Sequence, residues 1–406
     1  MVSAARASGR SRMAKYRYLI IGGGMTGDAA AHGIRKHDAT GSIGLVGAEL
    51  HAPYNRPPLS KGLWKGDAED SIWRKSGDTG VEHHLGRRAV RLDPGARRVT
   101  DDQGGVYEYE TLLLATGGTP RKLPGAPDGL IYFRTLDDYR RSRQLADRKA
   151  RFVVIGGGFI GSEVAAALRM QECAVTMIVP QDGLGARVFP ADLSRYLVDY
   201  YRQEGVTMLM GESVVRVEAA GGGYRVHTKG SGVIAADAVV AGLGIELNVE
   251  LARQAGLTVP DGIAVDEYLR TSQPSIYAAG DVASFPNPAL RKRIRVEHED
   301  NANTMGDVAG QNMAGAGLPY RHLPFFYSDL FKLGYEAVGE VDARHETVAD
   351  WREPMKEGVV YYLEAGRVRG VLLWNTWDQV DAARALIATP GPFRAADLKG
   401  RLPAPK

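Results

Sequence analysis

The chain passes twice, in the same order, from a short apolar run through glycines to an alanine-rich segment. Residues 16–37, YRYLIIGGGMTGDAAAHGIRKH, predict a strand, a glycine turn and a helix. Residues 151–172, RFVVIGGGFIGSEVAAALRMQE, predict the same three elements. A second apolar run follows each of them, SIGLVGAE after the first and AVTMIVPQ after the second. The repetition therefore predicts two βαβ units in one chain.

Three later apolar runs each end in glycine. YETLLLATGG at 109–118 closes the first unit, and ADAVVAGLG at 236–244 closes the second. A third run, QPSIYAAGD at 273–281, needs strand partners outside the second unit, so we predict that the second unit is inserted into the first. After it, alternating strands between PFFYSDLFKLGYEAVGEVD and GVVYYLEAGRVRGVLLWN, followed by the helix DQVDAARALI, predict a small α+β domain.

The predicted fold class is therefore α/β, with two Rossmann-like dinucleotide-binding domains, the second inserted in the first, and a small C-terminal α+β domain. The predicted limits are 16–125 with 246–325, 126–245, and 326–406. Residues 1–15, with Arg, Ser and Ala but no acid, predict a disordered tail. They equally fit a mis-assigned start, which leaves Met1 or Met13 open as the first residue.

Composition narrows the function classes. The 406 residues carry a net charge of +3, from 51 basic and 48 acidic residues, which favours no nucleic-acid partner. The basic run at 291–295 is interpreted as a solvated rim rather than a docking patch. No stretch approaches the roughly 20 apolar residues of a membrane-spanning helix, and we expect a cytoplasmic protein. No metal site is predicted.

The single cysteine, Cys173, excludes an internal disulfide and a CxxC redox pair. It lies in a helix-like apolar segment, where a buried, inert thiol is expected. A disulfide reductase is therefore excluded. Any redox chemistry of this chain must come from a cofactor.

The two glycine turns have the spacing G-x-G-x-x-G, with Gly22, Gly24 and Gly27 in the first and Gly156, Gly158 and Gly161 in the second. This spacing lets the backbone approach a pyrophosphate and directs a helix N-terminus at its charge. Because both turns follow an apolar strand and open a helix, the sequence predicts two bound dinucleotides.

An acidic residue is expected after the second strand of each unit, to accept a hydrogen bond from a ribose hydroxyl. Glu49 has this position in the first unit, although a solvated loop acid is the alternative. In the second unit the position holds Gln181, followed by Asp182. A neutral glutamine weakens the preference for NADH, and the choice between NADH and NADPH stays open.

The stretch NRPPLSKGLW, residues 55–64, is predicted to be rigid. Pro57 and Pro58 fix the backbone, and Ser60 is predicted to be the N-cap of a helix. The segment therefore holds two cations, Arg56 and Lys61, at fixed places.

Taken together, several motifs resemble those of one family; these are PYNRPPLSKGLW, LLATGGTPRKL, VIGGGFIGSE, IYAAGD, RVEHEDNA, FYSDL, GYEAVG and GVLLWN. The chain resembles the two-dinucleotide flavoprotein reductases, and most closely the apoptosis-inducing factor branch, from about residue 16 to 390. Ferredoxin and rubredoxin reductases share the first five motifs in looser form. The resemblance implies FAD in the first domain and a nicotinamide dinucleotide, NAD(H) with NADP(H) left open, in the second.

The resemblance and the glycine turns together assign residues to both cofactors. The FAD set is Gly22, Gly24, Met25, Thr26, Gly27, Glu49, Arg56, Lys61, Val90, Thr116, Gly117, Gly280, Asp281, Glu297 and His298. The NAD(P)H set is Gly156, Gly158, Phe159, Ile160, Gly161, Glu163, Gln181, Gly244, Tyr327 and Glu336. Lys61, Glu163 and His298 are the predicted catalytic residues.

Lys61 resembles the family lysine that lies beside the flavin ring and pairs with a glutamate, here Glu163. An ammonium held there stabilises the negative charge of the reduced flavin. Glu163 is also expected to help to seat the nicotinamide amide. The alternatives are an exposed lysine at a helix start and an acid favoured by the helix dipole.

Three further residues carry an implied role and an alternative. Phe159 is implied to cover the flavin and to move aside for the nicotinamide. The alternative is that its apolar ring is simply buried. His298 is implied at the flavin edge, with core or cap duty as the alternative. Asp281 is implied to bind a ribityl hydroxyl, and a strand-end turn residue is the alternative.

The chain departs from the branch in three places. Tyr327 replaces a tryptophan, which weakens stacking and adds a hydroxyl that can form a hydrogen bond. Gln181 replaces the expected acid. The C-terminal domain lacks the long insertion of animal apoptosis-inducing factor, which argues against a signalling role.

Two function classes follow. In the first, hydride passes from NAD(P)H to flavin N5, and a separate acceptor such as ferredoxin, rubredoxin or a quinone removes the electrons. A small iron–sulfur protein is the candidate partner. In the second, a redox sensor keeps a long-lived charge-transfer complex and changes its oligomer or partner. We favour the enzyme, and the family implies a homodimer.

Overall fold

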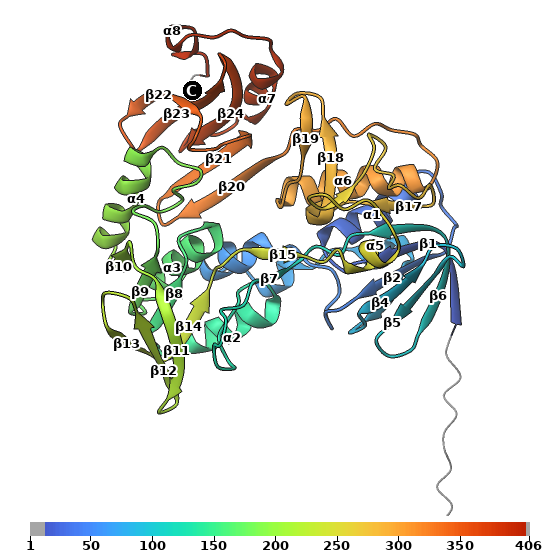
Figure 1. Cartoon of the computed structure of the whole chain (residues 1–406), viewed down its shortest axis with the longest axis horizontal. Helices are drawn as coiled ribbons and strands as arrows, with labels where there is room; N and C mark the ends of the chain where they lie inside the picture. Colours follow the sequence, from blue (N-terminus) through green and yellow to red (C-terminus); the bar gives the residue numbers. More distant parts are fainter. Residues whose placement is uncertain (1–12, 403–406) are drawn as a thin grey trace, which may run out of the picture.

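The computed structural model describes residues 13–402, and its first layer is a seven-stranded sheet (Figure 1). The strand order is β3-β2-β1-β6-β5-β4, and β17 also pairs with β6. The strands are β1 (Met13–Ile21), β2 (Ile43–Gly47), β3 (Glu82–Leu85), β4 (Ala89–Asp93), β5 (Arg98–Asp101), β6 (Val106–Leu114) and β17 (Ile276–Ala278). Strands β1, β2, β3, β6 and β17 pair in parallel, which places their carboxyl ends at one edge.

A second parallel sheet has the order β10-β9-β8-β14 and carries its own core. Its strands are β8 (Phe152–Ile155), β9 (Val175–Val179), β10 (Thr207–Met210) and β14 (Ala238–Ala241), with helices α2 (Leu136–Asp147), α3 (Phe159–Met170) and α4 (Ala191–Gln203). Beside it lies an antiparallel sheet of β11 (Val214–Ala220), β12 (Gly223–Thr228) and β13 (Val233–Ala236). The chain enters and leaves through β7 (Gly118–Pro120) and β15 (Ile245–Leu247), which pair with each other.

Strand β17 confirms the inserted arrangement. Ile276, Tyr277 and Ala278 pair with Leu112–Leu114 of β6, so the chain returns to the first sheet after the second one is complete. Residues after β15 also add α5 (Glu250–Gln254), η5 (Gly280–Val282) and a small sheet of β16 (Ile263–Ala264), β18 (Ala283–Asn287) and β19 (Lys292–Ile294). The domain limits given above stay predictions.

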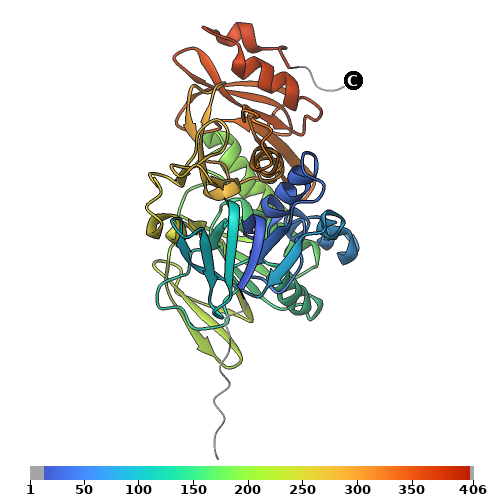
Figure 2. The ribbon, with the colours of Figure 1, turned by 90° about the vertical axis from the view of Figure 1, so that its right-hand side faces the viewer.

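The C-terminal part is a five-stranded antiparallel sheet in the order β20-β21-β24-β23-β22. It consists of β20 (Phe325–Leu330), β21 (Leu333–Gly339), β22 (Glu346–Glu353), β23 (Glu357–Glu364) and β24 (Arg367–Trp374), followed by α7 (Val380–Ala388) and α8 (Ala395–Leu398). Figure 2 shows this sheet at one end of the molecule, opposite the β11–β13 sheet. Strand β22 turns into β23 through residues 354–356, so this connection is short, as expected.

Helices α1 (Met25–Arg35) and α6 (Glu299–Met313) pack closely because glycines lie at their contact. A Cβ on Gly310 would come within 2.0 Å of the Ala30 carbonyl oxygen, and one on Gly33 within 2.2 Å of the Asp307 carbonyl oxygen. Because both obstacles are backbone atoms, larger residues would push the helices apart. This contact fixes the start of α6, and with it His298, relative to the first glycine turn.

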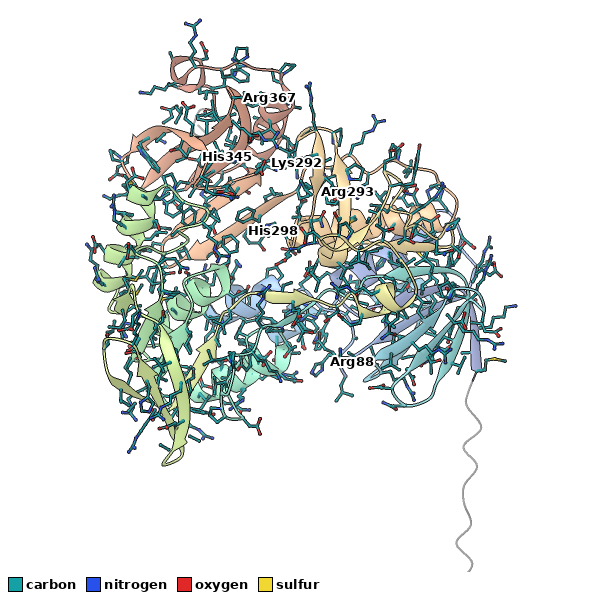
Figure 3. The ribbon with its side chains drawn as sticks, in the orientation of Figure 1. Arg88, Lys292, Arg293, His298, His345 and Arg367 are labelled. Atoms are coloured by element: carbon teal, nitrogen blue, oxygen red, sulfur yellow. The ribbon has the colours of Figure 1, made fainter. Side chains whose placement is uncertain are left out.

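The hairpin of β18 and β19 inserts its tip into the C-terminal domain. Leu290, at the tip, is 3% exposed and belongs to the core of the C-terminal sheet. Arg369 Nη1 donates to the Leu290 carbonyl oxygen at 3.0 Å, and Lys292 forms an ion pair with Glu340. Figure 3 shows Lys292 beside the C-terminal domain, which carries His345 and Arg367. The hairpin therefore anchors the C-terminal sheet to the first domain.

The basic run at 291–295 takes part in this anchor. The first three residues are exposed, as a solvated rim would be. However, Arg293 also donates to the carbonyl oxygens of Val265 and Ser284, and Arg295 pairs with Asp261 and Glu297. Most of its charge is thus bound within the chain.

Three local expectations need correction. The predicted tail at 1–15 is wrong for Met13–Lys15, which pair with β6 as the start of β1, whereas residues 1–12 lie outside the described residues. Ser60 is not an N-cap: it ends the 3₁₀ helix η1 (Pro57–Ser60), because two prolines begin that helix. Cys173 does not lie in α3 but follows the turn after that helix, and it is buried as expected.

The remaining short helices are η2 (Gly62–Trp64), η3 (Glu69–Ile72) and η4 (Ser76–Thr79). Together with η1 they form the connection from β2 to β3. Trp64 and Leu63 of this connection are buried against the core of the second domain. The segment that carries Arg56 and Lys61 is therefore packed between two domains rather than free in solvent.

We predict that Leu290→Ala lowers the free energy of unfolding by about 2–4 kcal/mol, because it leaves a cavity where the hairpin tip fills the C-terminal core. Chemical denaturation of the purified protein measures this. The matched control is Leu50→Ala, a leucine that is 79% exposed. Equal, small effects of the two substitutions would contradict the anchoring role of Leu290.

Candidate functional site

One cavity of about 1370 Å³ lies where the three domains meet. Its lining includes both glycine turns, the η1 segment, the first residues of β20 and the start of α6. Ligand pockets for a single small molecule are commonly ~300–1,000 Å³. The volume and the two turns together suit a site for two extended ligands.

The two glycine turns have the same local geometry. Gly22 and Gly156 have φ of +129° and +104°, and a Cβ there would collide with backbone of the neighbouring strand end. A Cβ on Gly27 or Gly161 would come within 2.1 Å of a carbonyl oxygen of its own turn. Each turn thus closes tightly against its strand and its helix.

The middle glycines face open space. Nothing lies within 4 Å of a Cβ built on Gly24 or Gly158, and both residues line the cavity. Each is the N-cap of its helix, and no side chain caps either helix. The backbone N–H groups of the first turns of α1 and α3 are therefore available to an anion, which fits the pyrophosphate of a dinucleotide.

The first-domain side of the cavity holds paired charges. Arg56 forms an ion pair with Glu49, and its Nη1 donates to the Arg134 carbonyl oxygen at 2.9 Å. Arg134 in turn pairs with Asp281 at 3.1 Å. Glu49 also accepts a hydrogen bond from the Tyr54 hydroxyl at 2.6 Å. These residues form one connected network, so the predicted Glu49, Arg56 and Asp281 lie together.

Glu163 connects the three domains through a single carboxylate. Its Oε2 accepts from Lys61 Nζ at 2.7 Å and from the Ser60 hydroxyl at 2.6 Å, both in the η1 region. Its Oε1 accepts from the Ser328 hydroxyl on β20 at 2.6 Å. Glu163 is 4% exposed, and the expected pair with Lys61 is present. Burying a carboxylate this deeply is costly unless donors such as these satisfy its oxygens.

Aromatic rings form one wall of the cavity. His298 stacks on Phe326 with ring centroids 4.2 Å apart, and Phe159 meets Phe326 at 5.1 Å. Burial lowers the pKa of His298 to about 4, although Asp281 and Asp300 oppose this shift. The imidazole is therefore neutral near pH 7 and contributes no charge to this wall.

Tyr327, which replaces the tryptophan of the apoptosis-inducing factor branch, makes two contacts in the cavity. Its hydroxyl donates to Glu299 Oε2 at 2.9 Å, and Lys61 Nζ lies 5.3 Å from the centre of its ring. The ring thus forms a cation–π contact with Lys61. The hydroxyl bond that the sequence allowed is present, and its acceptor is the first residue of α6.

Most of the predicted site residues line the cavity. Those that do not are Gly27, Gly161, Gly280 and Glu336. The three glycines act by allowing close packing; a Cβ on Gly280, for example, would meet the Thr26 hydroxyl at 2.4 Å. Glu336 lies on β21, where burial raises its pKa and Oε2 has no hydrogen-bond partner among residues 13–402. Its role at the nicotinamide stays a prediction.

Two family models together match nearly all of residues 16–357. Residues 16–306 match the model of the pyridine nucleotide-disulphide oxidoreductases, and residues 309–357 match that of apoptosis-inducing factor, mitochondrion-associated, C-terminal part. The chain belongs to the pyridine nucleotide-disulphide oxidoreductase family. The resemblance stated from the motifs is thereby confirmed, and the predicted cofactors, FAD and NAD(H), are those of this family.

Named relatives of this oxidoreductase cover more than nine-tenths of its length. It is 36% identical over 394 residues to the ferredoxin–NAD(+) reductase component of the anthranilate 1,2-dioxygenase system of Burkholderia cepacia, covering 94% of this chain and 97% of the relative. It is also 36% identical to the rhodocoxin reductase of Rhodococcus erythropolis, over 93% and 92% of the two chains. The crystal structure of the covalent putidaredoxin reductase–putidaredoxin complex matches with a TM-score of 0.86 at 30% identity, over 92% and 93%.

The sequence missed four cavity residues of this oxidoreductase. They are Ser60 as a donor to Glu163, Glu299 as the acceptor of Tyr327, Arg134 as the partner of Asp281, and Phe326 under His298. Three of them directly adjoin predicted residues, namely Lys61, His298 and Tyr327, so adjacency was a usable signal. Arg134 had no such signal in the sequence, because it precedes α2 and contacts Asp281 only in the folded chain.

No helix among residues 13–402 is long and apolar enough to cross a membrane.

We predict that Glu163→Gln lowers the free energy of unfolding by about 3–5 kcal/mol, because it leaves the Lys61 ammonium buried without its counter-ion. Urea denaturation of the purified protein measures the effect. The double variant Lys61→Met/Glu163→Gln, which removes both charges, is expected to recover much of the loss. The control is Asp199→Asn, in an exposed pair with Arg202. If Glu163→Gln is no more destabilising than this control, the carboxylate does not hold the domains.

A second prediction concerns pH. Because the pKa of His298 is lowered to about 4 in the folded chain, the unfolded chain binds this proton first as the pH falls from about 6.5. The part of the stability that depends on His298 is therefore complete above pH 6.5 and is lost progressively towards pH 4. The urea midpoints of wild type and His298→Gln, measured across this pH range, isolate the contribution of His298 as their difference. A difference that does not vary with pH would show that His298 titrates normally.

Proposed function

We propose that this chain is a ferredoxin–NAD(+) reductase that oxidises a nicotinamide dinucleotide and passes the electrons to a small iron–sulfur protein. The observation that carries the proposal is the Lys61–Glu163 pair, which lies in the one cavity that both glycine turns line. The relatives named as ferredoxin–NAD(+) reductase components support it, as does the similarity to putidaredoxin reductase in complex with its carrier.

The residues of the first domain suit FAD. The open Gly24 and the uncapped N-terminus of α1 would hold its pyrophosphate, and Glu49 with Arg56 would bind ribose and phosphate oxygens. Thr116 and Gly117 line the same side of the cavity. When bound, FAD supplies an acceptor at N5 for a hydride and releases the electrons singly. The second turn, around Gly158, would hold the nicotinamide dinucleotide.

Lys61 is the proposed catalytic residue. Its side chain is 11% exposed, and its ammonium contacts both Glu163 and the ring of Tyr327. A positive charge fixed at low solvent exposure stabilises developing negative charge without reorganisation. Glu163 positions Lys61. His298 and Phe159 keep the adjoining wall neutral and largely apolar, which excludes water from the place where hydride transfer is proposed.

A redox sensor is the second candidate function. The match of residues 309–357 to the C-terminal model of apoptosis-inducing factor favours it. In that case nicotinamide would stay bound after reduction and alter the oligomer or the partner. The short connections of the C-terminal sheet and the names of the relatives favour the reductase. Homodimer formation and a cytoplasmic location, where the NADH pool would supply the reductant, remain part of the proposal.

Anaerobic stopped-flow reduction of the purified holoprotein distinguishes the two functions. Rapid bleaching of flavin absorbance by NADH, followed by rapid reoxidation when an oxidised [2Fe–2S] ferredoxin is added, supports the reductase. Slow bleaching with a persistent long-wavelength band and no reoxidation by ferredoxin supports the sensor. A purified chain that binds no FAD contradicts both.

We predict that Lys61→Ala leaves FAD bound but lowers the rate constant of flavin reduction about 10²–10³-fold, the cost of losing one fixed electrostatic stabiliser. Single-turnover stopped-flow measures this constant. Lys65→Ala is the control, because Lys65 lies four residues on and pairs with Asp329 at the surface. An unchanged reduction rate in Lys61→Ala would exclude the proposed role.

A further inference from the structure

The loop that follows β9, residues 181–189, is fixed over the second glycine turn. Gly185 N donates to the Gly157 carbonyl oxygen at 3.0 Å, and Gly211 N donates to that of Gln181 at 3.1 Å. The Arg187 carbonyl oxygen accepts from Ala343 N at 3.0 Å, which ties the loop to the C-terminal domain. Gln181 and Arg187 both line the cavity. Their positions are therefore set by backbone bonds on three sides.

Two carboxylates that line this side of the cavity, Glu163 and Glu212, already have their full set of donors, whereas the exposed Asp182 beside Gln181 does not line it. Glu163 is bound by Lys61, Ser60 and Ser328. Glu212 accepts from the backbone N–H groups of Ser213, Gly230 and Ser231 and from the Ser231 hydroxyl, at 2.7–3.0 Å. Hydrogen bonds from Ser231 are the largest cause that lowers the pKa of Glu212 to about 2. Neither carboxylate is left to accept a hydrogen bond from a ribose hydroxyl.

Among residues 13–402, Arg187 is a cation that lines this side of the cavity and has no counter-ion. Its side chain is exposed and forms no ion pair or side-chain hydrogen bond with residues 13–402. By contrast, Arg56, Arg134 and Lys61 each pair with a carboxylate. Arg88 also lacks a carboxylate partner in the described chain, but Figure 3 shows it near β4, in the first domain.

From this geometry we infer that the adenine-ribose end of the nicotinamide site accepts a 2′-phosphate, with Arg187 as its ligand, so that the reductase uses NADPH as well as NADH. The inference rests on the proposed function and names its reductant. An acid at the end of the second strand selects NADH, because it bonds to the ribose 2′-hydroxyl and repels a phosphate there. Gln181 removes that repulsion, and Arg187 supplies a guanidinium that suits a phosphate.

The reaction is the same with either dinucleotide. In either case hydride would leave C4 of the nicotinamide with its electron pair and form the N5–H bond of the reduced flavin, leaving NAD⁺ or NADP⁺. The 2′-phosphate takes no part in bond making. Its contact with Arg187 therefore changes binding and kcat/KM for NADPH and leaves the chemistry of the reduction unchanged.

The test compares wild type, Arg187→Ala and Arg187→Lys as FAD-loaded protein, with NADH and NADPH in parallel. Wild type is expected to show kcat/KM values for the two within about tenfold. Arg187→Ala should lower the value for NADPH about 10–100-fold, as expected for losing a charge-assisted contact to phosphate, and change that for NADH less than about threefold. Arg187→Lys should recover part of the loss. Arg195→Ala, an exposed arginine on α4 outside the cavity, is the control.

Calorimetry gives a readout that does not depend on turnover. Adenosine 2′,5′-bisphosphate should bind wild type more tightly than 5′-AMP, and added salt should reduce this advantage. Arg187→Ala should abolish it. Equal binding of the two ligands to wild type, or an equal loss of NADH and NADPH activity in Arg187→Ala, would overturn the inference. If NADH alone reduces the flavin, only this inference fails; if neither dinucleotide does, the proposed function fails.

Discussion

The arrangement of the three domains depends on one buried carboxylate. Glu163 lies on helix α3 of the inserted domain. Its carboxylate accepts hydrogen bonds from two donors in the η1 region of the first domain and from one donor in the C-terminal sheet. A charge in this position is costly unless every lone pair is satisfied, and each domain provides part of what satisfies it. Any displacement of one domain would leave the carboxylate short of a donor, so the site is complete only when all three are docked.

Near this carboxylate, the charged residues lie beside a wall of uncharged rings. Lys61 contacts both Glu163 and the ring of Tyr327, whereas the adjoining wall of Phe326, Phe159 and His298 carries no charge near pH 7. With solvent limited, the field of a single ammonium is screened less than it would be in water. Pairing also distinguishes the cations that line the cavity near the second glycine turn. Lys61 is paired with Glu163, whereas Arg187 is exposed and has no partner among residues 13–402.

The sequence alone predicts those parts of the fold that depend on contacts between residues close together in the chain. The glycine turns, their strands and their helices follow from spacing, because each glycine meets atoms of its own turn or of the strand beside it. The insertion followed from counting strands, since a glycine-ended strand had no partner left. By contrast, Ser328 and Arg134 acquire their partners only across long sequence distances, 165 and 147 residues away. The N-cap prediction for Ser60 is wrong because it rests on the general preference for serine at helix N-caps, and only the fold brings Ser60 to Glu163.

The close packing of α1 and α6 has a consequence for how the chain is made. Helix α1 ends at Arg35 and α6 begins at Glu299, so more than 260 residues are synthesised between the two faces of one contact. At ribosomal rates of about 5–20 residues per second this interval is roughly 15–50 s. During it, the inserted domain can emerge complete, whereas the first sheet still lacks β17 and the helix that covers α1. The nascent chain therefore exposes apolar surface of its earliest domain longest, and that domain, though first to be translated, is among the last to close.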